Sequence, residues 1–284
     1  MSPEVVPWFH AATGTYSYLV CDPETRVAAI VDPVLDFDVR SARRSTLFAD
    51  ALIAHAHEKK LKVEWILETH AHADHLSAGA YLREELGAKL AIGAGIVGVQ
   101  KYFAPLFGFE ADFAADGSQF DTLFHDGDAF ALGGIAARVL ATPGHTGDGV
   151  CYVIGDAAFV GDTMFAPDVG TARCDFPGGD ARTLYRSIAR ILALPQETRL
   201  FLAHDYPPQG RAPKAETTIA AQRGGNAHLA KSEDEYVAMR EERDATLAVP
   251  NLLLPAVQYN IRGGRPPPPD ANGTAYLKLP LDVV

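Results

Sequence analysis

The string His70-Ala71-His72-Ala73-Asp74-His75, an H-x-H-x-D-H pattern, decides how the rest of the chain is interpreted. Its imidazoles and carboxylate are all metal donors. Residues 63–68, directly before it, are predicted to form a buried strand, and residues 77–86 suit a helix closed by Gly87. The string therefore begins as a strand ends, where loops can converge on one spot.

Three further donors follow in chain order. They are His145 in Thr142-Pro143-Gly144-His145-Thr146, Asp162 in Gly161-Asp162-Thr163 and His204 in Ala203-His204-Asp205-Tyr206. Each lies at or after the end of a predicted strand. One buried histidine is usually a hydrogen-bonded core residue, but coincidence does not explain this ordered set. Imidazole plus carboxylate is what a catalytic divalent metal requires, so the sequence predicts a metal site.

The spacing alone leaves the number of metals open. The seven donors could hold two metals bridged by Asp162, and such a pair would activate a water for hydrolysis. Alternatively, His70, His145 and Asp162 provide two imidazoles and one carboxylate. That facial arrangement leaves open positions on non-haem Fe(II) for O2 and a substrate.

The composition bounds the class of protein. The chain has 284 residues, of which 48% are apolar and 21% charged, as in ordinary globular proteins. A formal net charge of −11 without a basic cluster argues against a nucleic-acid partner. The three scattered cysteines form no disulfide framework, and neither a signal peptide nor a membrane span is predicted, so we expect a cytoplasmic protein without a membrane partner.

Strands and helices are predicted to alternate along the chain. Strands are expected at 16–21, 27–32, 90–92, 129–132, 135–141, 150–154, 157–161 and 200–204, and helices at 45–60, 180–194 and 215–222. Asp180 is a suitable N-cap. A charged stretch at 231–245 is predicted to be an exposed helix face, and a proline-rich tail follows. This order predicts the α/β class, with two mixed sheets and helices outside.

The string Gly93-Ala94-Gly95-Ile96-Val97-Gly98 is a literal G-x-G-x-x-G after a short strand. It follows the helix of the metal motif and does not open a Rossmann unit. We therefore predict a flexible loop over the pocket and no nicotinamide site.

The order H-x-H-x-D-H, T-P-G-H-T, G-D-T and A-H-D resembles the signature of the metallo-β-lactamase fold over roughly residues 15–230. The resemblance implies an αββα sandwich, with a catalytic domain at residues 1–230 and a C-terminal extension at 231–284 packed on or beside it. The resemblance says little about function, because the fold hosts lactamases, glyoxalase II, nucleases and oxidoreductases.

Finer features resemble the longer bacterial members of the persulfide dioxygenase (sulfur dioxygenase) family, which includes the ethylmalonic encephalopathy protein. They are Thr171-Ala172-Arg173-Cys174-Asp175-Phe176, Thr183-Leu184-Tyr185 and His204-Asp205-Tyr206. The resemblance implies that one Fe(II) and O2 convert glutathione persulfide, or a related small-molecule persulfide, to free thiol and sulfite. The implied iron ligands are His70, His145 and Asp162, and no second metal is implied for His72, Asp74, His75 and His204.

The same resemblance implies the substrate contacts. Arg173 and Tyr206 match the glutathione-contacting residues of the family, and Arg173 could pair with a peptide carboxylate. Otherwise they would be a surface arginine and a buried tyrosine. A further arginine of the family falls near His228, so the chain departs from the pattern there. The long tail and the family resemblance make a homodimer a reasonable expectation.

We therefore predict an Fe(II)-dependent persulfide dioxygenase. The alternative is a dinuclear thioester hydrolase of the glyoxalase II kind, and counting the bound metal separates the two. A lactamase is less attractive, since an intracellular protein would rarely meet the drug. A non-enzymatic persulfide or metal sensor is a further alternative that turnover would distinguish.

Overall fold

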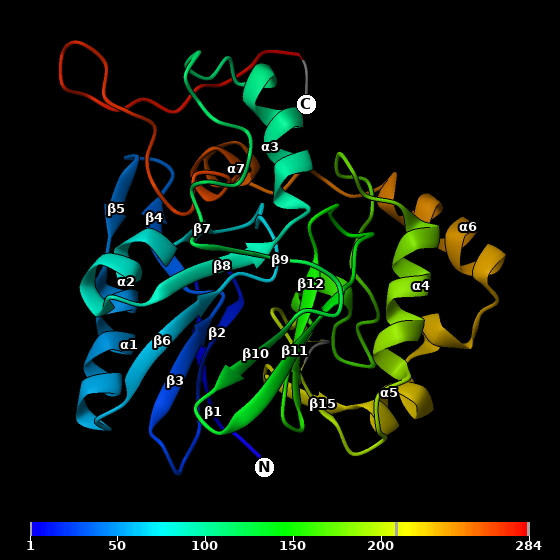
Figure 1. The fold of residues 1–284 in the computed structure, drawn as a ribbon. Helices are drawn as coiled ribbons and strands as arrows, with labels where there is room; N and C mark the ends of the chain where they lie inside the picture. The colour runs from blue at the N-terminus through cyan, green and yellow to red at the C-terminus, as the bar shows by residue number, and fades with distance from the viewer. Residues whose placement is uncertain (1, 208–209, 283–284) are drawn as a thin grey trace.

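The computed structural model of the protein describes residues 2–207 and 210–282. Two mixed sheets of six strands each face one another, and helices cover their outer sides (Figure 1). The first sheet has the strand order β1 (Glu4–His10), β2 (Thr15–Cys21), β3 (Val27–Val31), β6 (Lys62–Leu67), β8 (Lys89–Gly93) and β9 (Thr122–Phe124). Its strands β1 to β3 are antiparallel, whereas β3, β6, β8 and β9 run parallel.

The second sheet has the strand order β10 (Ala129–Leu132), β11 (Ile135–Ala141), β12 (Val150–Ile154), β13 (Ala157–Phe159), β14 (Arg199–Phe201) and β15 (Glu216–Thr218). Strands β13 and β14 are parallel, and the other neighbours are antiparallel. A smaller three-stranded sheet joins β5 (Arg43–Ser45), β4 (Val34–Asp38) and β7 (Leu76–Ser77).

The central core lies between the two sheets. Tyr18, Val20 and Val31 of the first sheet share one buried cluster with Tyr152 and Phe159 of the second. Because alternate residues of a strand point to opposite faces, the remaining apolar residues of each strand are available to the helices outside. Burial on both faces explains why several strands read as continuous apolar runs.

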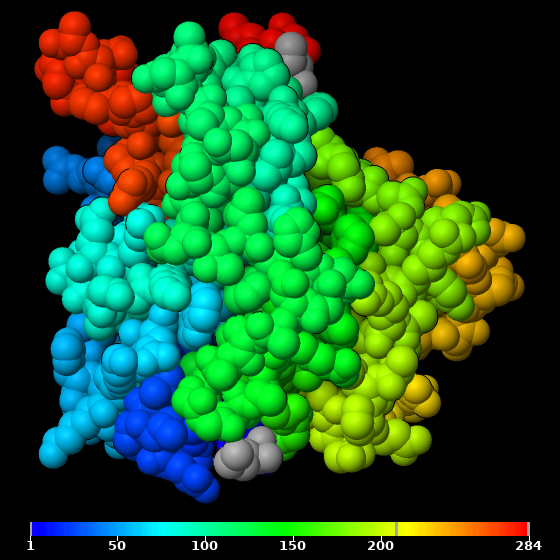
Figure 2. Space-filling view, viewed as in Figure 1, coloured from blue at the N-terminus to red at the C-terminus, as the bar shows by residue number. Residues whose placement is uncertain are grey.

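Helices cover the outer face of each sheet, which completes the αββα arrangement predicted from the sequence. Against the first sheet lie α1 (Leu47–Glu58), α2 (Gly79–Leu86), α3 (Ile96–Leu106) and α7 (Leu253–Asn260), and against the second lie α4 (Ala181–Leu192), α5 (Ile219–Gly225) and α6 (Glu233–Asp244). In Figure 2 the first part of the chain (blue to cyan) lies on one side, the yellow to orange part lies on the other, and the middle of the sequence (green) lies between them; the C-terminal residues (red) return to the top of the molecule.

Two predicted helical segments differ from the structure in extent or in burial. The helix expected at 215–222 begins only at Ile219, because residues 216–218 pair with β14 as strand β15. The charged stretch at 231–245 forms α6, but its face is exposed only in part. Tyr236, Arg240 and Asp244 are buried on its inner side, where α6 packs against α4.

The glycine-rich segment is a helix start and not the flexible loop predicted from the sequence. Gly93 ends β8, and α3 begins at Ile96. A Cβ on Gly93 would lie 2.5 Å from the carbonyl oxygen of Asp148, and one on Gly95 would lie 2.5 Å from that of Gly147. These glycines allow close approach of a distant backbone segment, a contact that their local sequence does not reveal.

Replacing Gly93 with alanine should therefore destabilise the fold by about 1–3 kcal/mol, because the added methyl overpacks against backbone. Gly98 of the same motif is the matched control, since a Cβ there meets nothing within 4 Å and the residue lies inside α3. Gly98→Ala should be neutral or stabilise by up to about 1 kcal/mol through helix propensity. Thermal unfolding of both variants tests this, and equal effects would contradict it.

The C-terminal residues are built into the first layer of helices. Leu253, Val257 and Ile261, on or next to α7, belong to the same buried cluster as α1 and α2. Beyond Arg265 the chain is mostly exposed, and it stands out from the body in red in Figure 2. The domain boundary near residue 230 stays a prediction. No helix of the described residues is long and apolar enough to cross a membrane.

Candidate metal centre

The seven predicted donors come from four loops that the fold brings together. The H-x-H-x-D-H loop follows β6, His145 follows β11, Asp162 lies in a 3-10 turn (Gly161–Thr163) after β13, and His204 follows β14. The turn at Asp162 requires glycine, because Gly161 has φ +51° and a Cβ there would lie 2.6 Å from Thr69 Oγ1. This contact places Asp162 beside the start of the metal loop.

His70, His145 and Asp162 form a closed donor set. They offer ligand atoms that all lie within 4.8 Å of one another. His145 Nε2 lies 3.5 Å from Asp162 Oδ2. The structure therefore brings together the three residues predicted to hold a single metal.

A hydrogen-bond relay orients His70. The Thr69 hydroxyl donates to Asp32 Oδ2 at 2.9 Å, so its oxygen is left to accept from His70 Nδ1, 3.0 Å away. This assignment puts the proton on Nδ1 and leaves Nε2 of His70 free to bind a metal. Burial lowers the pKa of His70 well below its usual value, which favours the neutral imidazole that metals bind.

Backbone carbonyls orient two further imidazoles in the same way. His145 Nδ1 lies 2.7 Å from the carbonyl oxygen of Arg173, and His204 Nδ1 lies 3.0 Å from that of Gly14. Each Nδ1–H donates to its carbonyl, and each Nε2 is turned toward the centre, where it would bind a metal in its unprotonated form. An outer acceptor that fixes the tautomer is the usual arrangement around metal-binding histidines.

Several inward atoms of these side chains make no hydrogen bond to the protein, and this observation tests whether a metal fits. Within the described part of the chain, buried atoms without a hydrogen-bond partner include His70 Nε2, His72 Nδ1, His75 Nε2, Asp162 Oδ1 and His204 Nε2. Buried polar atoms are normally satisfied, so a convergent group of orphans needs an explanation. A divalent cation with nitrogen and oxygen ligands satisfies them.

The remaining predicted donors form a second set beside the first. His72, Asp74 and His75 also offer ligand atoms within 4.8 Å of one another. His204 Nε2 lies 3.0 Å from Asp74 Oδ2 and 3.5 Å from Asp162 Oδ1. Burial opposes the charged form of His204, but Asp74 and Asp162 outweigh it and raise its pKa to about 10.

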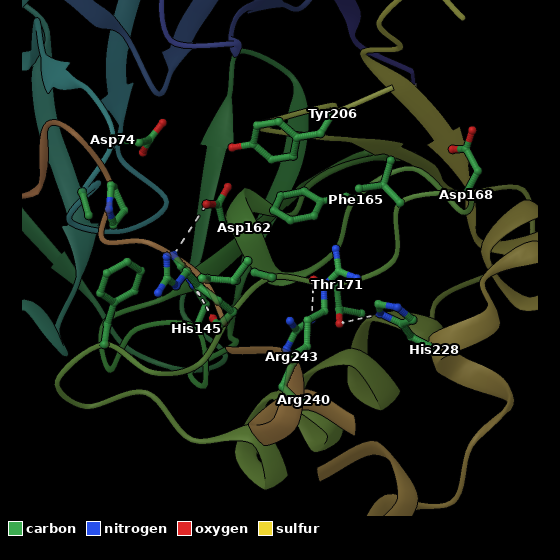
Figure 3. A pocket seen from close by; sticks show the side chains of 17 residues that line it. Asp74, His145, Asp162, Phe165, Asp168, Thr171, Tyr206, His228, Arg240 and Arg243 are labelled. Atoms are coloured by element: carbon green, nitrogen blue, oxygen red, sulfur yellow. Dashed lines mark hydrogen bonds and ion pairs between the residues drawn. The ribbon is translucent and has the colours of Figure 1, made fainter. Parts of the chain in front are cut away.

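A cavity of about 540 Å³ opens onto the donors (Figure 3). His145, Asp162 and Asp74 lie at its wall, while Phe165 and Phe176 supply apolar surface. This volume suits a small organic ligand. The structure therefore joins a candidate metal centre to a pocket of substrate size.

Both predicted substrate contacts line this cavity. Neither is the surface arginine or the buried tyrosine that it would be without a role in binding. The Arg173 side chain is only 15% exposed, whereas Tyr206 is 54% exposed. The guanidinium of Arg173 is engaged by both oxygens of Asp175, at 2.6 Å each, and by the carbonyl of Ala248. Arg173 is thus held in place, and Tyr206 presents its hydroxyl on the side of Asp162 (Figure 3).

Sequence reasoning missed Arg243, a cation that lines the same cavity from α6. Arg240 beside it is paired with Asp244, but within the described residues no carboxylate lies at ion-pair distance from Arg243. His228, where the family arginine was expected, also lines the cavity. Burial lowers its pKa, and Arg240 and Arg243 lower it further, so His228 is held neutral.

Sequence reasoning also missed the residues that hold the metal loop from outside. Asp32 accepts hydrogen bonds from Thr69 and His72, and Asp148 accepts one from the backbone N–H of Ala71 at 2.7 Å. Asp32 carried a weak signal, as a carboxylate at the end of an apolar strand. Asn260, whose side chain donates to the carbonyl oxygens of His72 and His75, lies almost 190 positions after the loop and carried no signal in the sequence.

Known proteins with similar sequences are described both as hydrolases and as dioxygenases. The chain is 53% identical to "Beta-lactamase hydrolase-like protein" of Agrobacterium fabrum over 99% of its length, and 50% identical to "Glyoxylase B2" of Dictyostelium discoideum over 99%. It is 31% identical to "Persulfide dioxygenase ETHE1, mitochondrial" of Bos taurus over 92%. The chain covers 65%, 97% and 89% of these proteins, respectively.

One solved structure agrees with the fold along nearly the whole chain. The crystal structure of ETHE1 from Myxococcus xanthus superposes with a TM-score of 0.74 at 31% identity, covering 92% of this chain and 100% of that one. Residues 11–204 match the description "Metallo-beta-lactamase superfamily", and they include all seven donors. The chain belongs to the metallo-beta-lactamase superfamily.

Proposed function

We propose that the protein is a persulfide dioxygenase that oxidises a small persulfide, such as glutathione persulfide, with O2 at one Fe(II). His70, His145 and Asp162 would hold the iron. The balanced reaction consumes one persulfide, one O2 and one water, and releases the free thiol and sulfite. The observation that carries the proposal is the closed set of two imidazoles and one carboxylate with free inward atoms.

Ferrous iron in such a setting supplies open coordination positions and the one-electron chemistry that lets sulfur react with O2. The protein supplies orientation. The carbonyls of Arg173 and Gly14 hold Nδ1 of His145 and His204, so both rings already turn Nε2 toward the centre. The relatives described as ETHE1 support this proposal, since both match about nine tenths of the chain or more.

The cavity fits an anionic thiol derivative. Desolvation in the pocket, together with Asp162 and Asp74, raises the pKa of Tyr206, so its phenol stays protonated and can donate to a sulfur anion. Phe165 lies beside Tyr206, with ring centroids 5.5 Å apart, and Phe176 adds further apolar surface to the cavity. Among the described residues no carboxylate pairs with the Arg243 guanidinium, although the net charge of the chain is −11. This free cation supports Arg243 as a contact for a substrate carboxylate.

Arg243→Ala should raise KM for glutathione persulfide by roughly 10- to 100-fold with little change in kcat, as expected for loss of a charged hydrogen bond of about 1.5–3 kcal/mol. A persulfide without carboxylates is the control substrate, and its KM should not change. Arg243→Lys should recover part of the affinity. An equal rise in KM for both substrates would remove Arg243 from the substrate contacts.

The direct test of function is turnover by anaerobically iron-loaded protein. With glutathione persulfide it should consume O2 and release sulfite in equal amounts. Iron-loaded protein that shows no such uptake would end the assignment. A glutathione thioester given to the same preparation should not be hydrolysed.

A second candidate is a dinuclear thioester hydrolase, and a specific observation favours it. His72, Asp74 and His75 form a second donor set. Asp162 Oδ1 lies near it without a hydrogen-bond partner among the described residues, and His204 Nε2 lies 3.0 Å from Asp74. The two relatives described as hydrolase-like and glyoxylase point the same way. About two zinc-like ions per chain would support the hydrolase, and one iron the dioxygenase.

A further inference from the structure

The metal loop of residues 70–75 has no backbone scaffold of its own. It lies outside the helices and strands, and among the described residues none of its backbone groups pairs with another backbone group. Side chains from elsewhere hold it instead. Asp148 accepts from the N–H of Ala71 at its start, and Asn260, from the C-terminal region, donates to backbone carbonyls in the remainder.

Asn260 uses all three of its principal hydrogen-bonding directions on this loop and its end. Its Nδ2 donates to the carbonyl oxygen of His72 at 2.7 Å and to that of His75 at 2.8 Å. Its Oδ1 accepts from the backbone N–H of Ser77 at 2.8 Å. A side-chain amide has two N–H donors, and here both point at the two carbonyls that flank Asp74.

Asn260 is held firmly by its surroundings. Asn260 is the last residue of α7, its side chain is buried with 4% exposure, and α7 packs beside β7 (Figure 1). Val257 and Ile261, on either side of it, belong to the buried cluster shared with α1 and α2. Because the Asn260 amide and the helix that carries it are both buried, the position of the amide determines the path of the loop backbone.

We infer that Asn260 is a positioning residue for metal binding: from the C-terminal helix, it fixes the backbone on which the metal-directed side chains of residues 70–75 are carried. Without it, two buried carbonyls lose their donors and the loop can rotate between Ala71 and Ser77. The donors would then have to be reordered each time a metal binds, and affinity would fall. The inference concerns metal retention and holds whether the reaction is an oxidation or a hydrolysis.

The chain offers a matched control in the same helix. Gln258 is also a buried amide, 1% exposed, that donates to two carbonyls, those of Leu254 and Lys278. It likewise accepts from one backbone N–H, that of Lys278. Gln258 thus makes the same number and kind of bonds as Asn260, but to its own helix and the tail instead of the metal loop.

The experiment compares Asn260→Ala and Gln258→Ala by ferrous-iron affinity, measured anaerobically against an iron chelator. Asn260→Ala should lose roughly 10- to 100-fold in affinity, as for other residues that orient ligands from outside. Gln258→Ala should stay within about two-fold of the wild type by the same principle, because its partners do not touch the loop. O2 uptake is not needed, so failure of the proposed function would not be mistaken for failure here.

A second readout separates positioning from general destabilisation. Bound metal stabilises the folded state by RT ln(1 + c/Kd), where c is the free metal concentration, so a tighter site gives a larger rise in unfolding temperature at the same metal concentration. The rise on adding ferrous iron should shrink in Asn260→Ala and stay unchanged in Gln258→Ala, even if both proteins are less stable without iron. Wild-type affinity in Asn260→Ala, or equal loss in both variants, would overturn the inference. Should Asn260→Ala not fold, Asn260→Ser, which keeps one donor, should show an intermediate loss, and wild-type affinity there would be equally decisive.

Discussion

Replacing Asp162 with alanine is expected to strip the centre of metal and abolish turnover. Asp162 is the only carboxylate in the donor set that it forms with His70 and His145. Two neutral imidazoles alone provide neither a third ligand nor negative charge to offset the cation. We expect ferrous-iron affinity to fall by more than about 100-fold, beyond the upper end of what loss of an outer orienting partner costs. Elemental analysis of the protein and O2 uptake with glutathione persulfide measure the two losses.

Asp156→Ala is the control for this variant. Asp162 follows β13, whereas Asp156 directly precedes this strand. At that end, away from the metal centre, Asp156 pairs with Arg199 at 3.0 Å. Loss of such a partly exposed ion pair should cost at most about 1 kcal/mol of stability and leave iron content and turnover unchanged. Full iron and activity in Asp162→Ala would show that the ligand assignment is wrong.

His70→Ala and His72→Ala are expected to differ sharply, although both remove buried histidines from the same loop. His70 contributes a free Nε2 to the single-metal set, so its removal should cost iron and activity as severely as loss of Asp162. His72 instead directs its Nε2 to Asp32 at 3.0 Å. Its removal leaves a buried acceptor with one donor fewer, which should cost about 1–3 kcal/mol of stability while iron and most turnover remain.

Iron content, O2 uptake and unfolding temperature of the two variants, measured side by side, decide between one metal and two. Comparable and near-total losses in both would contradict the single-metal proposal. With about two ions per chain in the wild type, they would instead support the dinuclear hydrolase.

Many of the strands and most helices could be predicted because their signals are local, whereas six strands were missed: β1, β4, β5, β7, β9 and β15. The turn between β2 and β3, the alternation along β11 and the N-cap of α4 all lie within a few residues of the elements they specify. Asp180 does accept from the backbone N–H of Thr183, as its position suggested. The helices that were missed contain residues that usually end a helix. Pro105 lies near the end of α3, and Pro255 lies in the first turn of α7, where its missing N–H costs little.

The glycine-rich segment shows why such local rules fail. Gly93 and Gly95 are required by the backbone of Gly147 and Asp148, more than fifty residues later. The sequence pattern suggested either a phosphate loop or a mobile one. Only the crossing of two distant segments explains why the glycines stand before a well-formed helix.

The sequence alone determined which chemical groups the centre has, because the identity of a donor is a property of the residue itself. Seven donors in a recognisable order were enough to predict the superfamily, the loops and a metal. The tertiary structure decided which nitrogen of each imidazole faces inward. That choice depends on acceptors such as the carbonyls of Gly14 and Arg173, and on the clamp from Asn260, which only the folded path of the backbone brings within hydrogen-bonding distance.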